Sequence, residues 1–159
     1  MPHEDDFIVS LFKEISIFSS LSSQSLSRLY AKFNERIFSQ GEIIFREGDG
    51  GDSMMVLASG EVRVSYLTST SEEEALIILK KGDLLGEMAL LESQPRSATA
   101  IAHTPTILLE ISQKDFLEYI EDDSAAGVPI LLHLSRILSA RLRETDIKLR
   151  AFISLTKWI

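Results

Sequence analysis

The chain has 159 residues, 45% of them hydrophobic and 25% charged, a composition typical of one folded domain rather than of a disordered or fibrous protein. Cysteine is absent, which excludes disulfides, zinc–thiolate sites and thiol nucleophiles. The formal net charge of -8 disfavours nucleic acids and anionic membranes as partners, and the acidic start of the chain is unlike a signal peptide. No uninterrupted apolar run approaches the ~18 residues of a membrane span, so we expect a cytoplasmic protein with no membrane or nucleic-acid partner.

Residues 7–34 have apolar side chains at helical spacing, which predicts two short N-terminal helices. Ser22 and Ser23 lie between the two apolar stretches and are candidate N-caps, because a serine hydroxyl can accept from the free amides of a first helical turn.

From residue 35 to residue 111 the pattern changes to short apolar runs separated by turn residues, which predicts strands. Val62, Val64 and Tyr66 alternate with polar residues, so one face of that strand is apolar. Short gaps between the runs favour antiparallel pairing. The polar tract Ser69–Glu74 is predicted to be a solvated hairpin loop. The predicted strands are Ile43–Phe45, Met54–Leu57, Val62–Leu67, Leu76–Leu79, Ala98–Ala102 and Ile107–Ile111.

Residues 112–159 return to helical spacing. Ser112 is a candidate cap for a helix over Gln113–Ile120, and Pro129 is expected to open a long helix towards the end of the chain. The predicted fold is α+β and mainly β: one domain over 1–159, in which an antiparallel β-roll or jelly roll is flanked by N-terminal helices and a long C-terminal helix.

The segment 86–99 carries the strongest functional signal. A glycine followed by a short helix-competent run aims backbone amides outward, where they can bind an anion. Arg96 adds a planar guanidinium that matches two oxygens of a phosphate, and Glu87 is an acceptor suited to a sugar hydroxyl. An acidic side chain next to a phosphate-binding site would repel a ligand that offered only a phosphate. A ligand with both a phosphodiester and a free hydroxyl can use both groups, and a cyclic nucleotide is such a ligand. The alternative is a structural ion pair between Glu87 and Arg96.

Ordered short motifs run through residues 10–120, namely Gly41-Glu42, Glu47-Gly48-Asp49, Ser59-Gly60-Glu61-Val62, Gly82-Asp83-Leu84-Leu85-Gly86-Glu87-Met88-Ala89 and Pro95-Arg96-Ser97-Ala98-Thr99. Together they resemble the cyclic-nucleotide-binding domain family, of the kind found in the catabolite activator protein and in protein kinase A regulatory subunits. The chain looks like a stand-alone, bacterial-type member. The resemblance implies that Glu87 binds the ribose 2′-hydroxyl, that Arg96 and the backbone of 86–89 bind the cyclic phosphate, and that Ser97 contacts phosphate or base. The candidate ligand-binding residues are Gly86, Glu87, Met88, Ala89, Arg96, Ser97 and Ala98.

In that family the long C-terminal helix covers the base and often pairs with its twin. The run from Arg141 to Asp146 resembles the base-contacting turn, and Thr145 is a polar gap in an apolar stripe. Asp146 departs from the small hydroxyl residue expected there. The alternative for both is an ordinary helix-surface or dimer-seam position. Further candidates for the ligand site are Val64, Leu85, Arg141, Thr145 and Asp146.

No catalytic, metal-binding or cofactor-binding residues are predicted, because the three histidines have no paired spacing and no catalytic triad motif is present. This disfavours a cupin enzyme, and the acidic chain, which stops at Ile159 without a helix-turn-helix pattern, disfavours a DNA-binding factor. Two hypotheses remain. One is a sensor of cAMP or cGMP that uses the C-terminal helix as lid and switch and signals through a homodimer or an effector protein. The other is a ligand-free dimerisation scaffold with a degenerate pocket.

Overall fold

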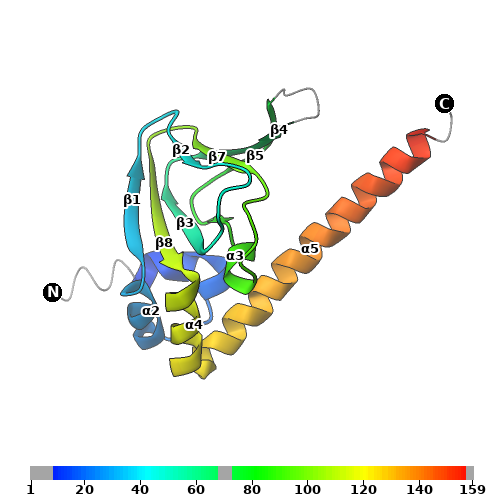
Figure 1. Ribbon diagram of the computed structural model, residues 1–159. Helices are drawn as coiled ribbons and strands as arrows, with labels where there is room; N and C mark the ends of the chain where they lie inside the picture. Colours follow the sequence, from blue (N-terminus) through cyan, green and yellow to red (C-terminus); the bar gives the residue numbers. More distant parts are fainter. Residues whose placement is uncertain (1–8, 68–72, 157–159) are drawn as a thin grey trace.

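The computed structural model, which describes residues 9–67 and 73–156, contains two four-stranded antiparallel sheets with helices at one end (Figure 1). The strand orders are β1-β8-β3-β6 and β2-β7-β4-β5. This arrangement confirms the predicted α+β jelly roll with flanking helices. Residues 9–14 are helical. The following elements are η1 (Ser16–Phe18), α2 (Ser23–Tyr30), β1 (Asn34–Phe38), β2 (Ile43–Phe45), β3 (Ser53–Ser59), β4 (Val62–Leu67), β5 (Glu73–Leu79), β6 (Leu84–Leu85), α3 (Met88–Leu91), β7 (Thr99–Ala102), β8 (Thr106–Ser112), α4 (Gln113–Asp122) and α5 (Ser124–Thr156).

The strand predictions were right in six places and missed two strands. β1 was missed because its residues are mostly polar and exposed, and it pairs with β8 at the edge of its sheet. β6 was missed because it is only two residues long. The predicted loop over Ser69–Glu74 is wrong at its end, since Glu73 and Glu74 belong to β5; positions 69–72 lie outside the described residues.

β3 is buried on both faces and separates two hydrophobic clusters. Successive side chains of a strand point to opposite faces, so Met54 and Val56 pack with the helices while Met55 and Leu57 pack inside the roll. Phe12, Phe18, Leu26, Phe116 and Ile130 anchor the cluster on the helical side. The helices therefore cover the outer face of this sheet, and the interior of the roll has a small apolar core of its own.

The two C-terminal helices begin at side-chain caps. The Ser112 hydroxyl accepts from the Asp115 amide at 3.0 Å, which confirms the predicted cap of α4. The prediction that Pro129 opens the long helix was wrong, since α5 begins at Ser124 and Pro129 lies inside it. Asp123 Oδ1 accepts from the Ala126 amide at 3.2 Å, and this earlier cap starts the helix before the proline.

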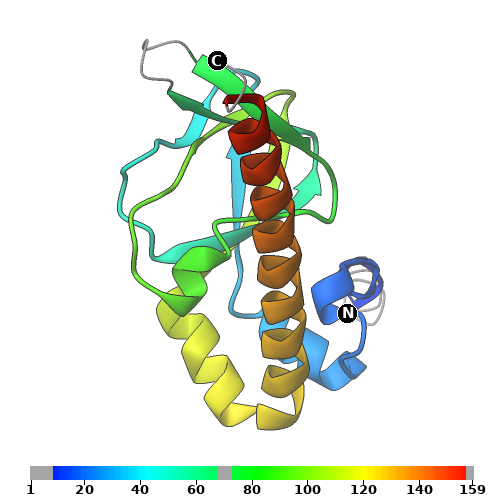
Figure 2. The same cartoon turned by 90° about the vertical axis from the view of Figure 1, so that its right-hand side faces the viewer.

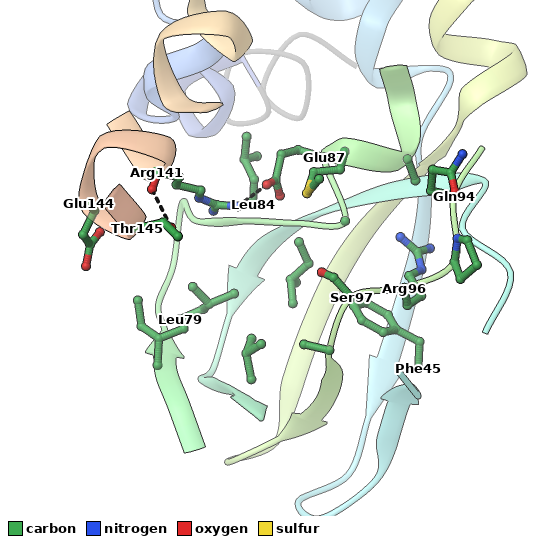
Figure 3. Close-up of a pocket in the computed structure, with 18 of the residues that line it drawn as sticks. Phe45, Leu79, Leu84, Glu87, Gln94, Arg96, Ser97, Arg141, Glu144 and Thr145 are labelled. Atoms are coloured by element: carbon green, nitrogen blue, oxygen red, sulfur yellow. Dashed lines mark hydrogen bonds and ion pairs between the residues drawn. The ribbon is translucent and has the colours of Figure 1, made fainter. Parts of the chain in front are cut away.

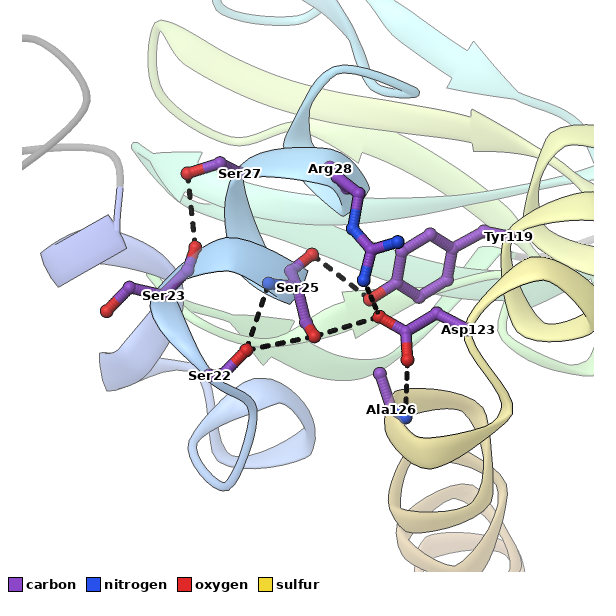
Figure 4. A network of polar contacts seen from close by, with 8 residues as sticks. All are labelled: Ser22, Ser23, Ser25, Ser27, Arg28, Tyr119, Asp123 and Ala126. Atoms are coloured by element: carbon purple, nitrogen blue, oxygen red, sulfur yellow. Dashed lines mark hydrogen bonds and ion pairs between the residues drawn. The ribbon is translucent and has the colours of Figure 1, made fainter.

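Asp123 also fixes the start of α5 to the N-terminal helices (Figure 4). Its Oδ2 accepts from the Ser25 hydroxyl at 2.8 Å and from the guanidinium of Arg28. The Tyr119 hydroxyl donates to the Ser25 carbonyl at 3.0 Å. Hydrogen bonds of Tyr119 in α4 and of Asp123, the residue between α4 and α5, thus hold this junction against α2.

From this junction α5 rises past the roll, as Figures 1 and 2 show. Its first half contributes Ala126, Ile130 and Leu134 to the helical-side core. By length and by a mean hydropathy of 1.2, part of α5 would also qualify as a membrane span. The burial of those three side chains against the domain accounts for some of that apolar content.

Candidate functional site

A cavity of about 420 Å³ lies between the interior of the roll, the segment around α3, and α5 (Figure 3). Its volume is within the usual range for a small-molecule site. Its lining combines apolar strand residues with a few charged and hydroxyl groups, which is typical of a site that binds an amphipathic ligand. The lining residues are Phe45, Val64, Ile77, Leu79, Leu84, Leu85, Gly86, Glu87, Met88, Ala89, Gln94, Pro95, Arg96, Ser97, Ala98, Arg141, Glu144, Thr145 and Lys148.

The structure brings every predicted ligand-site residue to this cavity except Asp146. Asp146 is exposed and lies about 200° around the helix from Glu144, so it points away from the face of α5 on which Glu144, Thr145 and Lys148 line the cavity. Met88 is 46% exposed and lines the cavity, whereas Met54 and Met55 are buried.

The backbone of Arg96 is fixed by the turn that precedes β3. Its amide donates to the Asp49 carbonyl and its carbonyl accepts from the Gly48 amide, both at 2.8 Å. On the side chain, Nη1 donates to the Ser53 carbonyl at 2.7 Å and Nη2 to the Ser53 hydroxyl at 2.9 Å. The guanidinium carbon lies 4.5 Å from the centre of the Phe45 ring, within range of a cation–π contact. Arg96 is therefore held at one place in the cavity wall before any ligand binds.

Gly86 leaves room for this arginine. Its φ of +68° lies in the left-handed region that glycine adopts without steric cost, and a Cβ at this position would meet Arg96 Nη1 at 2.1 Å. The backbone of residue 86 and the guanidinium of residue 96 can lie together only because residue 86 has no side chain.

The Arg96 guanidinium is a buried cation with an unused donor. Arg96 is only 8% exposed, and its Nε is the buried side-chain N/O atom left without a hydrogen-bond partner among the described residues. Burial lowers the pKa of the guanidinium, and the nearby carboxylates of Asp52, Glu110, Asp49 and Glu87 partly oppose that shift. An unpaired buried donor costs about 1–3 kcal/mol, so an anion that accepts from Nε would bind favourably here.

Glu87 is bound to the long helix. It is 2% exposed, and its Oε1 accepts from Nη1 of Arg141 in an ion pair that joins the segment before α3 to α5. The alternative reading of a Glu87–Arg96 ion pair is thus replaced by a Glu87–Arg141 pair. A carboxylate has two oxygens and room for more than one donor, so this contact leaves capacity for a ligand hydroxyl.

The hydroxyl groups of the site differ in their present bonding. Ser97 is exposed to the cavity. The Thr145 hydroxyl donates to the Arg141 carbonyl at 2.9 Å, a bond within its own helix. Next to it, Lys148 and Glu144 form an ion pair of 2.7 Å on the cavity side of α5.

Sequence reasoning missed several lining residues. Glu144 and Lys148 could have been found, because helical spacing places them on the same face as Arg141 and Thr145. The others come from strands whose facing direction the sequence does not reveal, or from the loop before Arg96. The missed residues are Phe45, Ile77, Leu79, Leu84, Gln94, Pro95, Glu144 and Lys148.

Within the described residues, no group of three or more His, Asp or Glu side chains is arranged to hold a metal ion. A jelly roll whose cavity holds a buried arginine, a buried glutamate and one face of a long helix defines a binding domain for a small anionic ligand with hydroxyl groups.

Comparison with known proteins specifies the class. Residues 35–123 match the family model of the cyclic nucleotide-binding domain, so the chain belongs to the cyclic nucleotide-binding domain family, a family of regulatory domains. It is 35% identical over 134 residues to the cyclic AMP receptor protein of Thermus thermophilus, covering 84% of this chain and 60% of that protein. It is 31% identical over 117 residues to a cGMP-dependent protein kinase of Caenorhabditis briggsae, covering 72% of this chain and 16% of the kinase.

Among solved structures, the catabolite activator protein of Thermus thermophilus matches with a TM-score of 0.77 and 34% identity. That match covers 86% of this chain and 62% of the other. The chain thus spans less than two thirds of the length of these relatives.

Proposed function

We propose that this chain is a cyclic-nucleotide sensor in which cAMP or cGMP fills the cavity and α5 acts as the lid. The observation that carries the proposal is that Glu87 and Arg96 open onto one cavity whose remaining wall is α5. No catalysis and no additional cofactor is part of the proposal.

The phosphate of the ligand lies at Arg96. The buried guanidinium supplies positive charge, its Nε is an unsatisfied donor, and residues 86–89 line the same cavity. A charge-assisted contact of this kind is stronger than a neutral hydrogen bond, which suits a singly charged cyclic phosphate.

The sugar of the ligand lies at Glu87. Its ribose 2′-hydroxyl donates to the carboxylate, which already accepts from Arg141. Because the carboxylate can accept from both, the ligand adds a second contact next to the one that holds α5.

The base extends towards the apolar residues Val64, Ile77 and Leu79 and the facing surface of α5, where Thr145 lies. Apolar side chains bury the ring faces, and hydroxyl groups can donate or accept at the ring edge. Ser97 and Thr145 suit either purine, so both cAMP and cGMP belong to the proposal.

The switch consists of the position of α5. A ligand shifts a conformational equilibrium only by its differential affinity for the two states, and moving a helix from mostly open to mostly closed takes roughly 3 to 5 kcal/mol. The Arg141–Glu87 pair links the lid to the ligand-binding carboxylate, and this gives the ligand a route by which to favour the closed state.

The output of the sensor is a homodimer through α5, or an effector protein bound there. Leu142 and Leu149 are 64% and 53% exposed in the single chain and follow the helical spacing of a dimer seam. The same surface supports the second candidate function, a dimerisation scaffold that works without ligand. Neither function requires a nucleic acid or a membrane.

Isothermal titration calorimetry with cAMP, cGMP and 5′-AMP tests the proposal. 5′-AMP is the matched control for cAMP, because it has the same base and sugar but an open, more highly charged phosphate. We expect saturable binding of at least one cyclic nucleotide, tighter than that of 5′-AMP. In a thermal-shift assay, a ligand at a hundred times its Kd adds about 2.7 kcal/mol of stability. Absence of binding and of any shift with both cyclic nucleotides would favour the scaffold.

A further inference from the structure

A row of polar side chains crosses the inner face of one sheet and ends at Arg96. Arg36 on β1, Glu110 on β8 and Ser53 on β3 come from adjacent strands of the β1-β8-β3-β6 sheet. Alternate residues of a strand lie on the same face of the sheet, so Glu110 shares a face with Leu108 and Ser53 shares a face with Met55. Leu108 and Met55 both pack inside the roll. The row therefore faces the roll interior, although neither Ser53 nor Glu110 lines the cavity.

The contacts along this row are continuous. Arg36 Nη1 donates to Glu110 Oε2 at 2.7 Å, and the Ser53 hydroxyl donates to Glu110 Oε1 at 2.8 Å. Arg96 Nη2 in turn donates to the same Ser53 hydroxyl at 2.9 Å. Since the serine proton is directed at Glu110, the oxygen lone pairs are directed at Arg96.

The geometry points to Glu110 as a positioning residue: through the Ser53 hydroxyl it holds the Arg96 guanidinium in the orientation that binds an anionic ligand. This role rests on the proposed function of Arg96 as the phosphate ligand. Glu110 itself contacts neither the cavity nor the ligand.

The contacts of Glu110 explain why residue 110 is a carboxylate and residue 36 an arginine. Glu110 needs two acceptor oxygens because it accepts from Arg36 and from Ser53 at once. Arg36 balances the charge of Glu110, so the carboxylate can orient Ser53 while adding little net repulsion towards a phosphate. With Nη1 and Nη2 both bound to Ser53, Nε is the Arg96 donor that remains without a partner.

The test is a double-mutant cycle read by calorimetry with cAMP and cGMP. Glu110→Ala and Ser53→Ala should each weaken binding by about tenfold, the effect of losing one hydrogen bond that orients a charged group. Glu110→Gln keeps an acceptor for Ser53 and should stay within about threefold of the unmodified chain. Glu35→Ala, which removes an exposed carboxylate of β1, is the charge control and should leave affinity unchanged.

In an Arg96→Lys background, Glu110→Ala should have no further effect, because the guanidinium that it positions is gone. An equal loss in both backgrounds would overturn the inference, as would unchanged affinity in Glu110→Ala and Ser53→Ala.

A ligand-free measurement separates this inference from the proposed function. In nitrogen-15 NMR spectra, the Arg96 side chain should give signals of restricted rotation in the unmodified protein and in Glu110→Gln, and averaged signals in Glu110→Ala. If the protein binds no cyclic nucleotide but these spectra behave as expected, the proposed function fails and the positioning role stands. If the Arg96 signals are the same in all three proteins, the positioning role fails whatever the protein binds.

Discussion

Arg141 of α5 donates a hydrogen bond to Glu87 of the segment before α3, across 54 positions of sequence. This contact joins α5 to a carboxylate that is 2% exposed. Removing Arg141 would leave the buried Glu87 carboxylate without its cation, so the position of α5 affects the surroundings of Glu87.

Arg141→Ala should weaken cyclic-nucleotide binding by about three- to thirtyfold, because α5 loses its tie to the sugar end of the site. Calorimetry measures the affinity, and hydrogen exchange of α5 should become faster in the free protein. Arg143→Ala removes an exposed arginine of the same helix that does not line the cavity, and is the matched control. Equal affinities for the two variants would show that the pair has no part in binding.

Gly86→Ala should reduce both stability and affinity. The new Cβ would meet Arg96 Nη1 at 2.1 Å, and the φ of +68° would be strained. Gly82→Ala is a matched control, since Gly82 has a φ of +91° and open space around the position of a Cβ. Both variants should lose about 1–2 kcal/mol of unfolding free energy from backbone strain, but only Gly86→Ala should weaken ligand binding. A similar loss of affinity in both would mean that displacement of Arg96 is not the cause.

Asp123 should make the stability of the protein depend on pH at the acidic end. The hydrogen bond from Ser25, with smaller effects of the Ala126 amide and Arg28, holds the pKa of the Asp123 carboxyl below its usual range, although burial acts in the opposite direction. A lowered folded-state pKa favours the charged form. The charged Asp123 carboxylate therefore contributes fully to the stability of the fold above the unfolded pKa of about 3.9, and this contribution is lost as the pH falls through the folded pKa.

Asp123→Ala should lower the unfolding free energy in urea by about 1–2 kcal/mol at pH 7, because α5 loses its cap and its tie to α2. The difference from the unmodified chain should stay constant down to about pH 5 and shrink below about pH 4. Asp122→Ala removes the adjacent, exposed carboxylate as a control. A difference that does not change between pH 7 and pH 3 would contradict the assigned role of the Asp123 charge.

Leu149→Asp should abolish an α5-mediated dimer in light scattering. Ile147→Asp is a matched control. Ile147 is also an exposed hydrophobic residue, with an exposed fraction of 68% against 53% for Leu149, but it lies about 200° around the helix from Leu149. We expect the unmodified chain and Ile147→Asp to be dimers and Leu149→Asp a monomer, measured with and without cyclic nucleotide. A monomeric unmodified chain in both conditions would rule out the homodimer as the output.

The segment that lines the cavity around α3 could be predicted because its residues are close in sequence. Gly86, Glu87 and Arg96 lie on one short stretch, and all three line the cavity. Phe45 could not be assigned to the cavity, because the pairing of β2 with β7 shifts register between Ile43 and Phe45, and a register shift changes which face a side chain occupies.

The contact between Arg141 and Glu87 could not be predicted for a different reason. It depends on where α5 starts and how it crosses the roll. The sequence suggested a start at Pro129, whereas the Asp123 cap starts the helix at Ser124, five residues and about 7.5 Å of helix earlier. The tie between Asp123 and α2 then directs the helix, and that tie joins residues 98 positions apart.

The central claim, that Arg96 binds the phosphate of a cyclic nucleotide, is tested most directly by calorimetric titration of Arg96→Ala, with Arg46→Ala as an exposed-arginine control that does not line the cavity. Circular dichroism should confirm that both variants are folded. We predict at least tenfold weaker binding for Arg96→Ala and unchanged binding for Arg46→Ala. A folded Arg96→Ala variant with the affinity of the unmodified chain would contradict the account.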